Sequence, residues 1–152
     1  MEERKILNAS LNNYSAGRFG NIRHLIEKPI DITKLPVAGE GFYKKQTGDK
    51  YGHIIIKIGL ASEVVMDGFD YYSQYSFAWL VDEQTIPYAY FKSNIEPVLI
   101  ELAFLLTYFK CCDTPICFSI IGGSFRFNER PNSFITATSL ALEDALRKLR
   151  ES

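Results

Sequence analysis

The β-branched run from His53 to Ile58 constrains the fold most strongly. Four of its six residues are isoleucine, and Gly52 and Gly59 stand directly outside it. Isoleucine packs well on a pleated surface, and glycines often bound such runs, so the run predicts a strand buried within a sheet. The rest of the chain must therefore supply further strands and a covering layer.

A second segment with the pattern of a strand covers residues 69–81. Polar residues occupy several of its even positions, whereas all but one of its odd positions are aromatic or apolar. This period of two predicts one long amphipathic strand after a turn at Asp67-Gly68, with an aromatic face that helices cover. The aromatic and apolar residues at odd positions are Phe69, Tyr71, Tyr75, Phe77, Trp79 and Val81.

The next stretch predicts a helix that begins between Ser93 and Pro97. Ser93 and Glu96 have the spacing of a capping box, and Pro97 suits only the first turn of a helix. The segment then stays mostly apolar as far as Phe109. With so few polar positions, this helix is expected to be buried on more than one side.

Residues 115–121 predict a third strand, which ends at Gly122-Gly123, and a final helix follows from Asn132 or Ser133. In that helix, Glu143 with Arg147 and Asp144 with Lys148 are spaced four residues apart in the favourable order. Its apolar stripe is expected to face the core. The stripe consists of Ile135, Ala141, Leu142, Ala145, Leu146 and Leu149.

The order strand, strand, helix, strand, helix predicts an α+β fold with two helices packed on one face of a sheet. A length of 152 residues suits one hydrophobic core. We divide the chain into an N-terminal extension, residues 1–41, and a main domain, residues 42–152. The extension forms either a helix with an extra strand or an arm that wraps another element.

Composition limits the function classes. The net charge of −1 argues against a wholly basic nucleic-acid protein, although the first fifty residues have an excess of cations. Cys111, Cys112 and Cys117 have no nearby histidine to complete a metal site, so we expect reduced, mostly buried thiols and no metal or other cofactor. The longest apolar stretch contains Glu101 and is too short to span a bilayer, and we find no secretory signal, so we expect a cytoplasmic protein.

Three collinear motifs carry a resemblance to domain IV of translation elongation factor G. Residues 44–56, with Tyr51-Gly52-His53 before the buried strand, resemble the family's Gln-Ser-Gly-Gly-Arg-Gly-Gln run leading into Tyr-Gly-His-Val. The passage from Ile86-Pro87 through residues 95–98 to Pro115-Ile116 resembles its Ile-Pro, Tyr-Ile-Pro-Ala-Val and Tyr-Pro-Val-Val segments. Residues 123–126 and 133–145 resemble its Gly-Ser-Tyr-His and Ala-Phe-Lys-Ile-Ala-Gly-Ser-Met-Ala-Leu-Lys-Glu-Ala segments.

The resemblance covers residues 42–149 and implies a β-α-β unit with a left-handed crossover, the uncommon hand. In the family, two loops at the tip of this domain reach the decoding region of the small ribosomal subunit. They correspond here to Gln46–Lys50 and Ser124–Asn132, each shorter by about one residue. Arg126, or Phe127 in a register shifted by one, replaces the family's tip histidine.

Cations and aromatic residues alternate around these two loops. Ammonium and guanidinium groups neutralise phosphates while aromatic rings stack on unpaired bases, so this mixture suits RNA that is not helical. The alternative is that the rings complete the core and the cations are solvated. The candidate RNA-binding residues are Lys44, Lys45, Lys50, Tyr51, Phe125, Arg126 and Arg130.

The sequence offers little for catalysis. It lacks the Gly-x-x-x-x-Gly-Lys-Ser/Thr phosphate loop, so we expect neither nucleotide binding nor GTP hydrolysis. Neither His24 nor His53 has a suitably spaced partner for a triad, and His53 reads as a hydrogen-bonded structural residue. We expect a non-enzymatic protein that binds the small ribosomal subunit or a structured RNA.

The alternative is a protein-interaction module that keeps the fold without binding RNA. It would assemble, as a homo-oligomer or with a partner, through the apolar helix at Leu99–Phe109 or through residues 1–38. A Gly-x-x-Gly at residues 17–20 resembles the loop of KH domains, but the extension is too short for such a domain.

Overall fold

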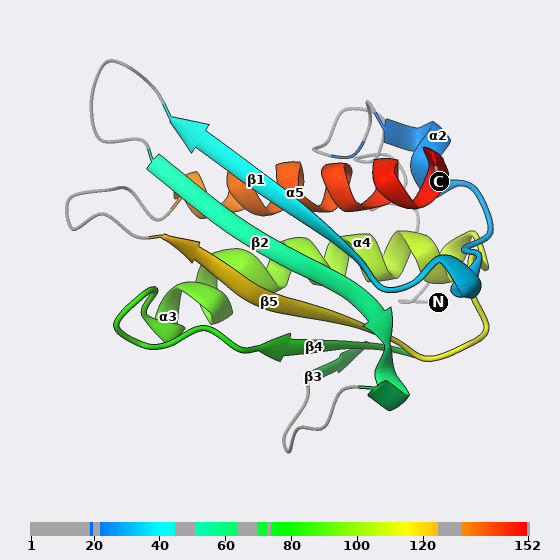
Figure 1. Cartoon of the computed structure of the whole chain (residues 1–152), viewed down its shortest axis with the longest axis horizontal. Helices are drawn as coiled ribbons and strands as arrows, with labels where there is room; N and C mark the ends of the chain where they lie inside the picture. The colour runs from blue at the N-terminus through cyan, green and yellow to red at the C-terminus, as the bar shows by residue number, and fades with distance from the viewer. Residues whose placement is uncertain are drawn as a thin grey trace, which may run out of the picture.

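The computed structural model describes Phe19 and residues 22–44, 51–63, 70–72, 74–124 and 132–151 (Figure 1). Its elements, in chain order, are α2 (Arg23–Ile26), η2 (Ile32–Lys34), β1 (Val37–Lys44), β2 (Tyr51–Leu60), η3 (Ala61–Glu63), β3 (Asp70–Tyr72), β4 (Tyr75–Trp79), α3 (Tyr88–Tyr90), η4 (Phe91–Ile95), α4 (Glu96–Tyr108), β5 (Ile116–Ser124) and α5 (Asn132–Glu151).

The five strands form one mixed sheet in the order β1-β2-β5-β4-β3. Neighbouring strands are antiparallel except β4 and β5, which are parallel. Helices α4 and α5 both lie behind the sheet in Figure 1 and cover one of its faces. The α+β fold with two helices on one face is therefore confirmed.

The parallel strands β4 and β5 are joined by a left-handed crossover. They lie side by side, and the chain passes between them through α3, η4 and α4. In Figure 1 both strands point left, the connecting helices lie behind the sheet, and β5 lies above β4, which is the left-handed arrangement. Such connections are right-handed in nearly all proteins, so this hand is a distinctive property of the fold.

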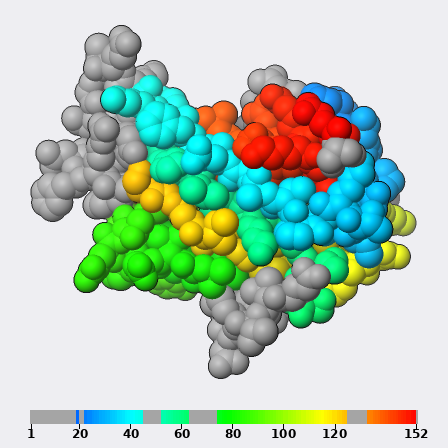
Figure 2. Space-filling model, viewed as in Figure 1, coloured from blue at the N-terminus to red at the C-terminus, as the bar shows by residue number. Residues whose placement is uncertain are grey.

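Strand β2 confirms the buried strand predicted at residues 53–58 and extends it at both ends. Ile54, Ile56 and Ile58 are buried, whereas Lys57 between them is exposed. The isoleucines therefore point toward the helices. The lysine marks the opposite side, which we call the front face of the sheet because it is turned toward the viewer in Figures 1 and 2.

The aromatic segment is not one strand, as predicted, but the hairpin of β3 and β4, in which Tyr72 pairs with Tyr75. The two connecting residues are serine and glutamine, so no glycine, proline, asparagine or aspartate marked the turn. The predicted contact of the aromatic face with helices is confirmed for β4, where Trp79 stacks on Phe91 of η4 with ring centroids 5.1 Å apart.

Helix α4 begins at Glu96, within the range predicted from Ser93 to Pro97, but the predicted capping box does not form. Helical structure starts earlier, at Tyr88, whose backbone N–H donates to the Glu83 carboxylate at 2.9 Å. The Ser93 hydroxyl instead donates to the Ala89 carbonyl at 2.9 Å, within the helix. The capping box was wrong because helical structure upstream already satisfies the backbone at this point.

The π-helical turn η4 directly precedes Glu96 and Pro97. A proline inside an α-helix removes one backbone hydrogen bond, and its ring clashes with the carbonyl four residues earlier. The wider π turn accommodates the proline, so the helix continues through η4 into α4 instead of starting there.

Helix α4 is buried on more than one side, as predicted. The segment before β1 packs against its end, where the Ile30 N–H donates to the Cys111 carbonyl at 2.8 Å. The buried residues of α4 are Val98, Leu99, Leu102, Ala103, Leu105 and Leu106.

The three cysteines are free thiols, of which Cys111 and Cys117 are buried and Cys112 is partly buried. No helix within the described ranges has the length and apolar character to cross a bilayer.

Helix α5 has both predicted ion pairs, Arg147 with Glu143 at 2.6 Å and Lys148 with Asp144 at 3.1 Å. The predicted stripe is buried except for Ile135, which is partly buried. The structure therefore confirms both the buried stripe and the ion pairs predicted for this helix.

Helix α5 lies in direct backbone contact with β1. A Cβ atom placed on Gly41 would lie 1.8 Å from the Ala137 carbonyl oxygen, and one on Gly39 would lie 2.1 Å from that of Ala141. No side chain fits in either space. The two glycines therefore fix the distance between the helix and the sheet.

The segment before β1 belongs to the same hydrophobic core as the sheet. Ile22, Leu25 and Ile26 are buried together with residues of β2, α4 and α5. The boundary predicted between residues 41 and 42 falls inside β1, which pairs with β2 along its whole length. The described part of the extension thus supplies an edge strand and a short helix.

Arg150 near the end of α5 holds this segment in place. Its guanidinium donates to the carbonyls of Leu25 at 3.0 Å and Lys28 at 2.6 Å, and also to that of Pro29. Burial lowers the pKa of Arg150 from its usual value. One side chain therefore binds three backbone oxygens where α2 ends.

Tyr75 buries a hydroxyl group that has no hydrogen-bond partner among the described residues. Burial raises the pKa of Tyr75 from 10.0 to about 12, although the neighbouring Gln74 side chain opposes the rise. Tyr75→Phe is expected to leave stability unchanged or to raise it by up to about 1 kcal/mol, because the hydroxyl loses its water without gaining a bond.

The pH dependence of unfolding checks this prediction for Tyr75. The raised pKa in the folded state disfavours ionisation, so the wild type loses stability as pH rises from 10.0 toward about 12. Tyr75→Phe removes this ionisation, and its stability advantage is expected to grow over the same range. Urea unfolding at pH 7 and at several alkaline values would contradict this if the two proteins lost stability in parallel.

Candidate nucleic-acid interface

Three strand ends meet at one end of the sheet, which we call the loop end. Lys44, the last residue of β1, pairs with Tyr51, the first of β2. Ser124, the last residue of β5, pairs with His53 of β2. Residues 45–50 and 125–131 therefore both leave the sheet at this end.

The start of α5 lies at the same end. A Cβ atom on Gly52 would lie 2.4 Å from the Ser133 carbonyl oxygen, so β2 and the first turn of α5 are in contact. Both ends of both predicted loops are thus anchored at the loop end. Residues more than seventy positions apart in the sequence come together there.

The described ranges include two of the predicted RNA-binding residues. Lys44 is exposed, and the backbone of Tyr51 pairs with it across β1 and β2. The other predicted residues lie outside the described ranges and stay predictions. They are Lys45, Lys50, Phe125, Arg126 and Arg130.

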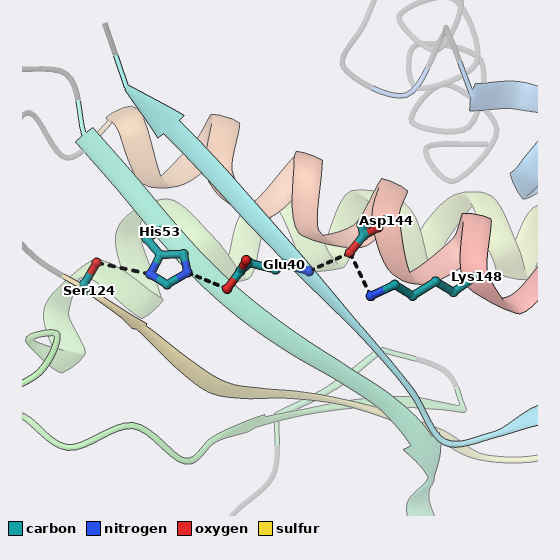
Figure 3. Close-up of polar contacts among 5 residues, drawn as sticks. All are labelled: Glu40, His53, Ser124, Asp144 and Lys148. Atoms are coloured by element: carbon teal, nitrogen blue, oxygen red, sulfur yellow. Dashed lines mark hydrogen bonds and ion pairs between the residues drawn. The ribbon is translucent and has the colours of Figure 1, made fainter.

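His53 joins three strands through a series of polar contacts (Figure 3). Its Nδ1 lies 3.1 Å from the Ser124 hydroxyl, and its Nε2 lies 2.8 Å from the Glu40 carboxylate. The imidazole side chain is only 21% exposed, whereas that of Glu40 is 58% exposed. The prediction of His53 as a hydrogen-bonded structural residue is confirmed.

Sequence reasoning missed both partners of His53. Glu40 and Ser124 lie 13 and 71 residues away in the chain, so only the strand register brings them together. Serine, histidine and a carboxylate are the members of a hydrolytic triad. The Glu40 carboxylate, however, lies in solvent, where charge interactions with an imidazole are weak. The series ties β1, β2 and β5 together beside the two loops.

A second set of contacts fixes β1 against α5. The Glu40 N–H donates to the Asp144 carboxylate at 2.9 Å, and the Lys148 ammonium donates to the Ala38 carbonyl at 3.1 Å. Burial opposes ionisation of Asp144, but the Glu40 hydrogen bond and the Lys148 ammonium hold the pKa of Asp144 below its usual value. The strand that ends in Lys44 is therefore fixed by side chains of the helix.

The described residues include no cluster of three or more metal-ligating side chains. The exposed groups of the front face near the loop end are Lys44, Phe42 and Glu40, whose carboxylate contacts His53. Lys57 is exposed on the same face but lies farther along β2, opposite Ala38. A ring beside a cation can hold an anionic, aromatic ligand better than it can perform acid or base chemistry.

No protein-family model matches the chain. A solved crystal structure of a protein from Thermus thermophilus has a similar fold. Its TM-score is 0.56, with 24% sequence identity over 80% of this chain and 16% of that one. At this identity the likeness concerns the fold alone.

The chain is also similar to ubiquitin carboxyl-terminal hydrolase 16 of Arabidopsis thaliana. The two are 25% identical over 115 residues, which is 75% of this chain and 11% of the plant protein. The chain thus spans less than a fifth of the length of each of these two proteins. Both likenesses concern one segment of a much longer chain.

Proposed function

We propose that this protein is a non-catalytic, ribosome- or RNA-associated protein related to domain IV of elongation factor G, acting without a GTPase of its own. The observation that carries the proposal is the convergence of the two loop anchors at one end of a sheet with a left-handed crossover. The resemblance implies both features, and the crossover is rare in other folds.

Charge at the loop end supports an anionic partner. Residues 44–51 contain three lysines and one aspartate, and residues 124–131 contain two arginines and one glutamate. Phosphate neutralisation by such cations supplies most of the non-specific affinity for RNA, even where the whole protein is not basic. The net charge of −1 is therefore compatible with local RNA binding.

We do not extend hydrolase activity to this chain from the Arabidopsis protein. A reactive thiolate must be accessible, whereas Cys111 and Cys117 are buried and Cys112 is partly buried. Burial also raises the pKa of the Cys111 thiol. The proposal therefore concerns binding only.

Charge reversal at the two loops tests the proposal. Lys50→Glu and Arg126→Glu are each expected to weaken co-sedimentation with purified small ribosomal subunits at low salt by about tenfold, and to reduce the salt dependence of binding. The control variants are Lys28→Glu and Lys110→Glu, each two residues beyond the last residue of a helix, α2 and α4 respectively. These helix ends lie at the end of the molecule opposite the loop end (Figure 1), so both variants should leave binding unchanged.

Absence of association with the subunit and with isolated RNA at every ionic strength would refute the proposal. Equal losses in the loop and control variants would show that overall charge, not the loop end, determines binding. Circular dichroism of each variant separates loss of binding from loss of structure.

The alternative, a protein-interaction module, placed its contact on the helix at Leu99–Phe109 or on residues 1–38. Leu99, Leu102 and Leu106 are buried inside the protein, and so is Ile26 of the extension, so these side chains offer no docking surface. Ile100 and Tyr108 of the same helix are exposed, and residues 1–18, 20 and 21 lie outside the described ranges. The alternative therefore stays a prediction, and sedimentation equilibrium of the full chain tests it.

A further inference from the structure

Phe42 is the most exposed of the large hydrophobic side chains in the described ranges, at 52%. It belongs to β1, where buried Gly39 and Gly41 face α5, so Phe42 points to the front face of the sheet. Figure 2 shows this face, with β1, β2 and β5 side by side. When a ligand covers an exposed aromatic ring, apolar surface is removed from water, and this burial favours binding.

The position of Phe42 links it to the loop end. Lys44 lies two residues further along β1, on the same face and about 6.8 Å away along the strand. On the other side of the ring lies Glu40, whose carboxylate contacts His53, and Lys57 of β2 lies farther away, opposite Ala38. The ring therefore has an exposed cation, the last residue of β1, on the side of the loop end.

His53 restricts the orientation of the Phe42 ring. The two residues are register partners, and their rings meet edge to face with centroids 5.7 Å apart. Both nitrogens of the imidazole make polar contacts, with Ser124 and Glu40, which fixes the His53 ring in turn. A ring held in one orientation before binding loses little conformational entropy when a ligand stacks on it.

We propose that the front face at Phe42 is a stacking site for a base of single-stranded RNA, with Lys44 contacting the adjacent phosphate. This inference rests on the proposed function and identifies its ligand as unpaired RNA. Stacking on aromatic side chains needs bases that are not held within a helix, and it tolerates any sequence because every base has a π face. Lys44 and the excess of cations in residues 44–51 and 124–131 favour a phosphate backbone over an apolar protein surface.

Fluorescence anisotropy with a labelled RNA of about twelve nucleotides tests the site, using the full chain and the same strand as a single strand and as a duplex. Phe42→Leu keeps an apolar side chain but removes the π face, and is expected to weaken single-strand binding by about 5- to 100-fold. Duplex binding should change little, and Phe42→Tyr should restore single-strand binding. Tyr108→Leu is the matched control, because it removes an exposed ring from the far end of α4.

Single-strand binding that is unchanged in Phe42→Leu but lost in Lys50→Glu would overturn this inference and leave the proposed function intact. Absence of single-strand binding in the wild type would overturn this inference, and the proposed function would fall with it only if the protein also did not co-sediment with the small subunit. Equal losses for single strand and duplex would rule out stacking. Loss of a dimer in Phe42→Leu, seen by sedimentation equilibrium without any change in RNA affinity, would identify the face as a protein contact instead. Unchanged melting midpoints confirm that each variant is folded.

Discussion

Gly41→Ala is expected to destabilise the protein by about 3 kcal/mol or more, measured as the free energy of unfolding in urea. The new methyl group would lie 1.8 Å from the Ala137 carbonyl oxygen and 2.5 Å from the Ala141 nitrogen. Both atoms belong to the backbone of α5 and cannot move aside by a rotamer change. The whole helix must shift, and its packing on β1 and β2 is lost with it.

The matched control for this prediction is Gly59→Ala in β2. The nearest atom to a Cβ at that position is the Pro36 Cβ, 3.7 Å away, which is an ordinary van der Waals contact. The control is therefore expected to change stability by less than about 1 kcal/mol and could stabilise the strand. Similar effects of the two substitutions would show that loss of glycine, rather than the close approach of α5, determines the result.

Arg150→Met is expected to lower the free energy of unfolding by about 2–3 kcal/mol. Methionine keeps an apolar stem but leaves the carbonyls of Leu25, Lys28 and Pro29 without their charged donor. Because these oxygens belong to the segment before β1, amide hydrogen exchange should increase there first, notably at Ile30, and less in β2. Urea unfolding gives the overall loss.

Arg147→Met is the control for Arg150, since it removes an arginine three residues away on the same helix. Arg147 makes one exposed ion pair with Glu143. Such pairs contribute about 0.5 kcal/mol or less, so this variant should retain nearly full stability. A loss as large as that of Arg150→Met would mean that helix charge, rather than the bonds to the segment, stabilises the contact.

Local patterns in the sequence predicted those elements whose residues interact with near neighbours in the chain. The isoleucines of β2 form a continuous β-branched run and the ion pairs of α5 are spaced four residues apart, and the structure has both the strand and the pairs. The hairpin of β3 and β4 and the early start of the helix at Tyr88 were missed. The hairpin turn carries no strong signal, and the helix is capped by Glu83, five residues upstream.

The candidate site was harder to predict because it depends on strand register. The resemblance predicted that the two loops converge, and the ladder pairs of Lys44 with Tyr51 and His53 with Ser124 bring their anchors together. Phe42 and Glu40 were missed because each becomes notable only beside His53. The one indication in the sequence was that Phe42 occupies an even position of this strand, in line with Ala38, Glu40 and Lys44, so its ring shares a face with charged residues.

The contacts of Asp144 and Lys148 with β1 have a consequence for self-association. β1 is the first strand of the sheet, so within the described ranges no strand pairs with its outer edge. Outer edges of this kind can recruit strands from other molecules and so begin aggregation. Here the Glu40 N–H and the Ala38 carbonyl are already hydrogen-bonded to α5 side chains. An incoming strand would have to displace both bonds, which disfavours strand pairing at this edge and leaves the front face beside it accessible to a ligand.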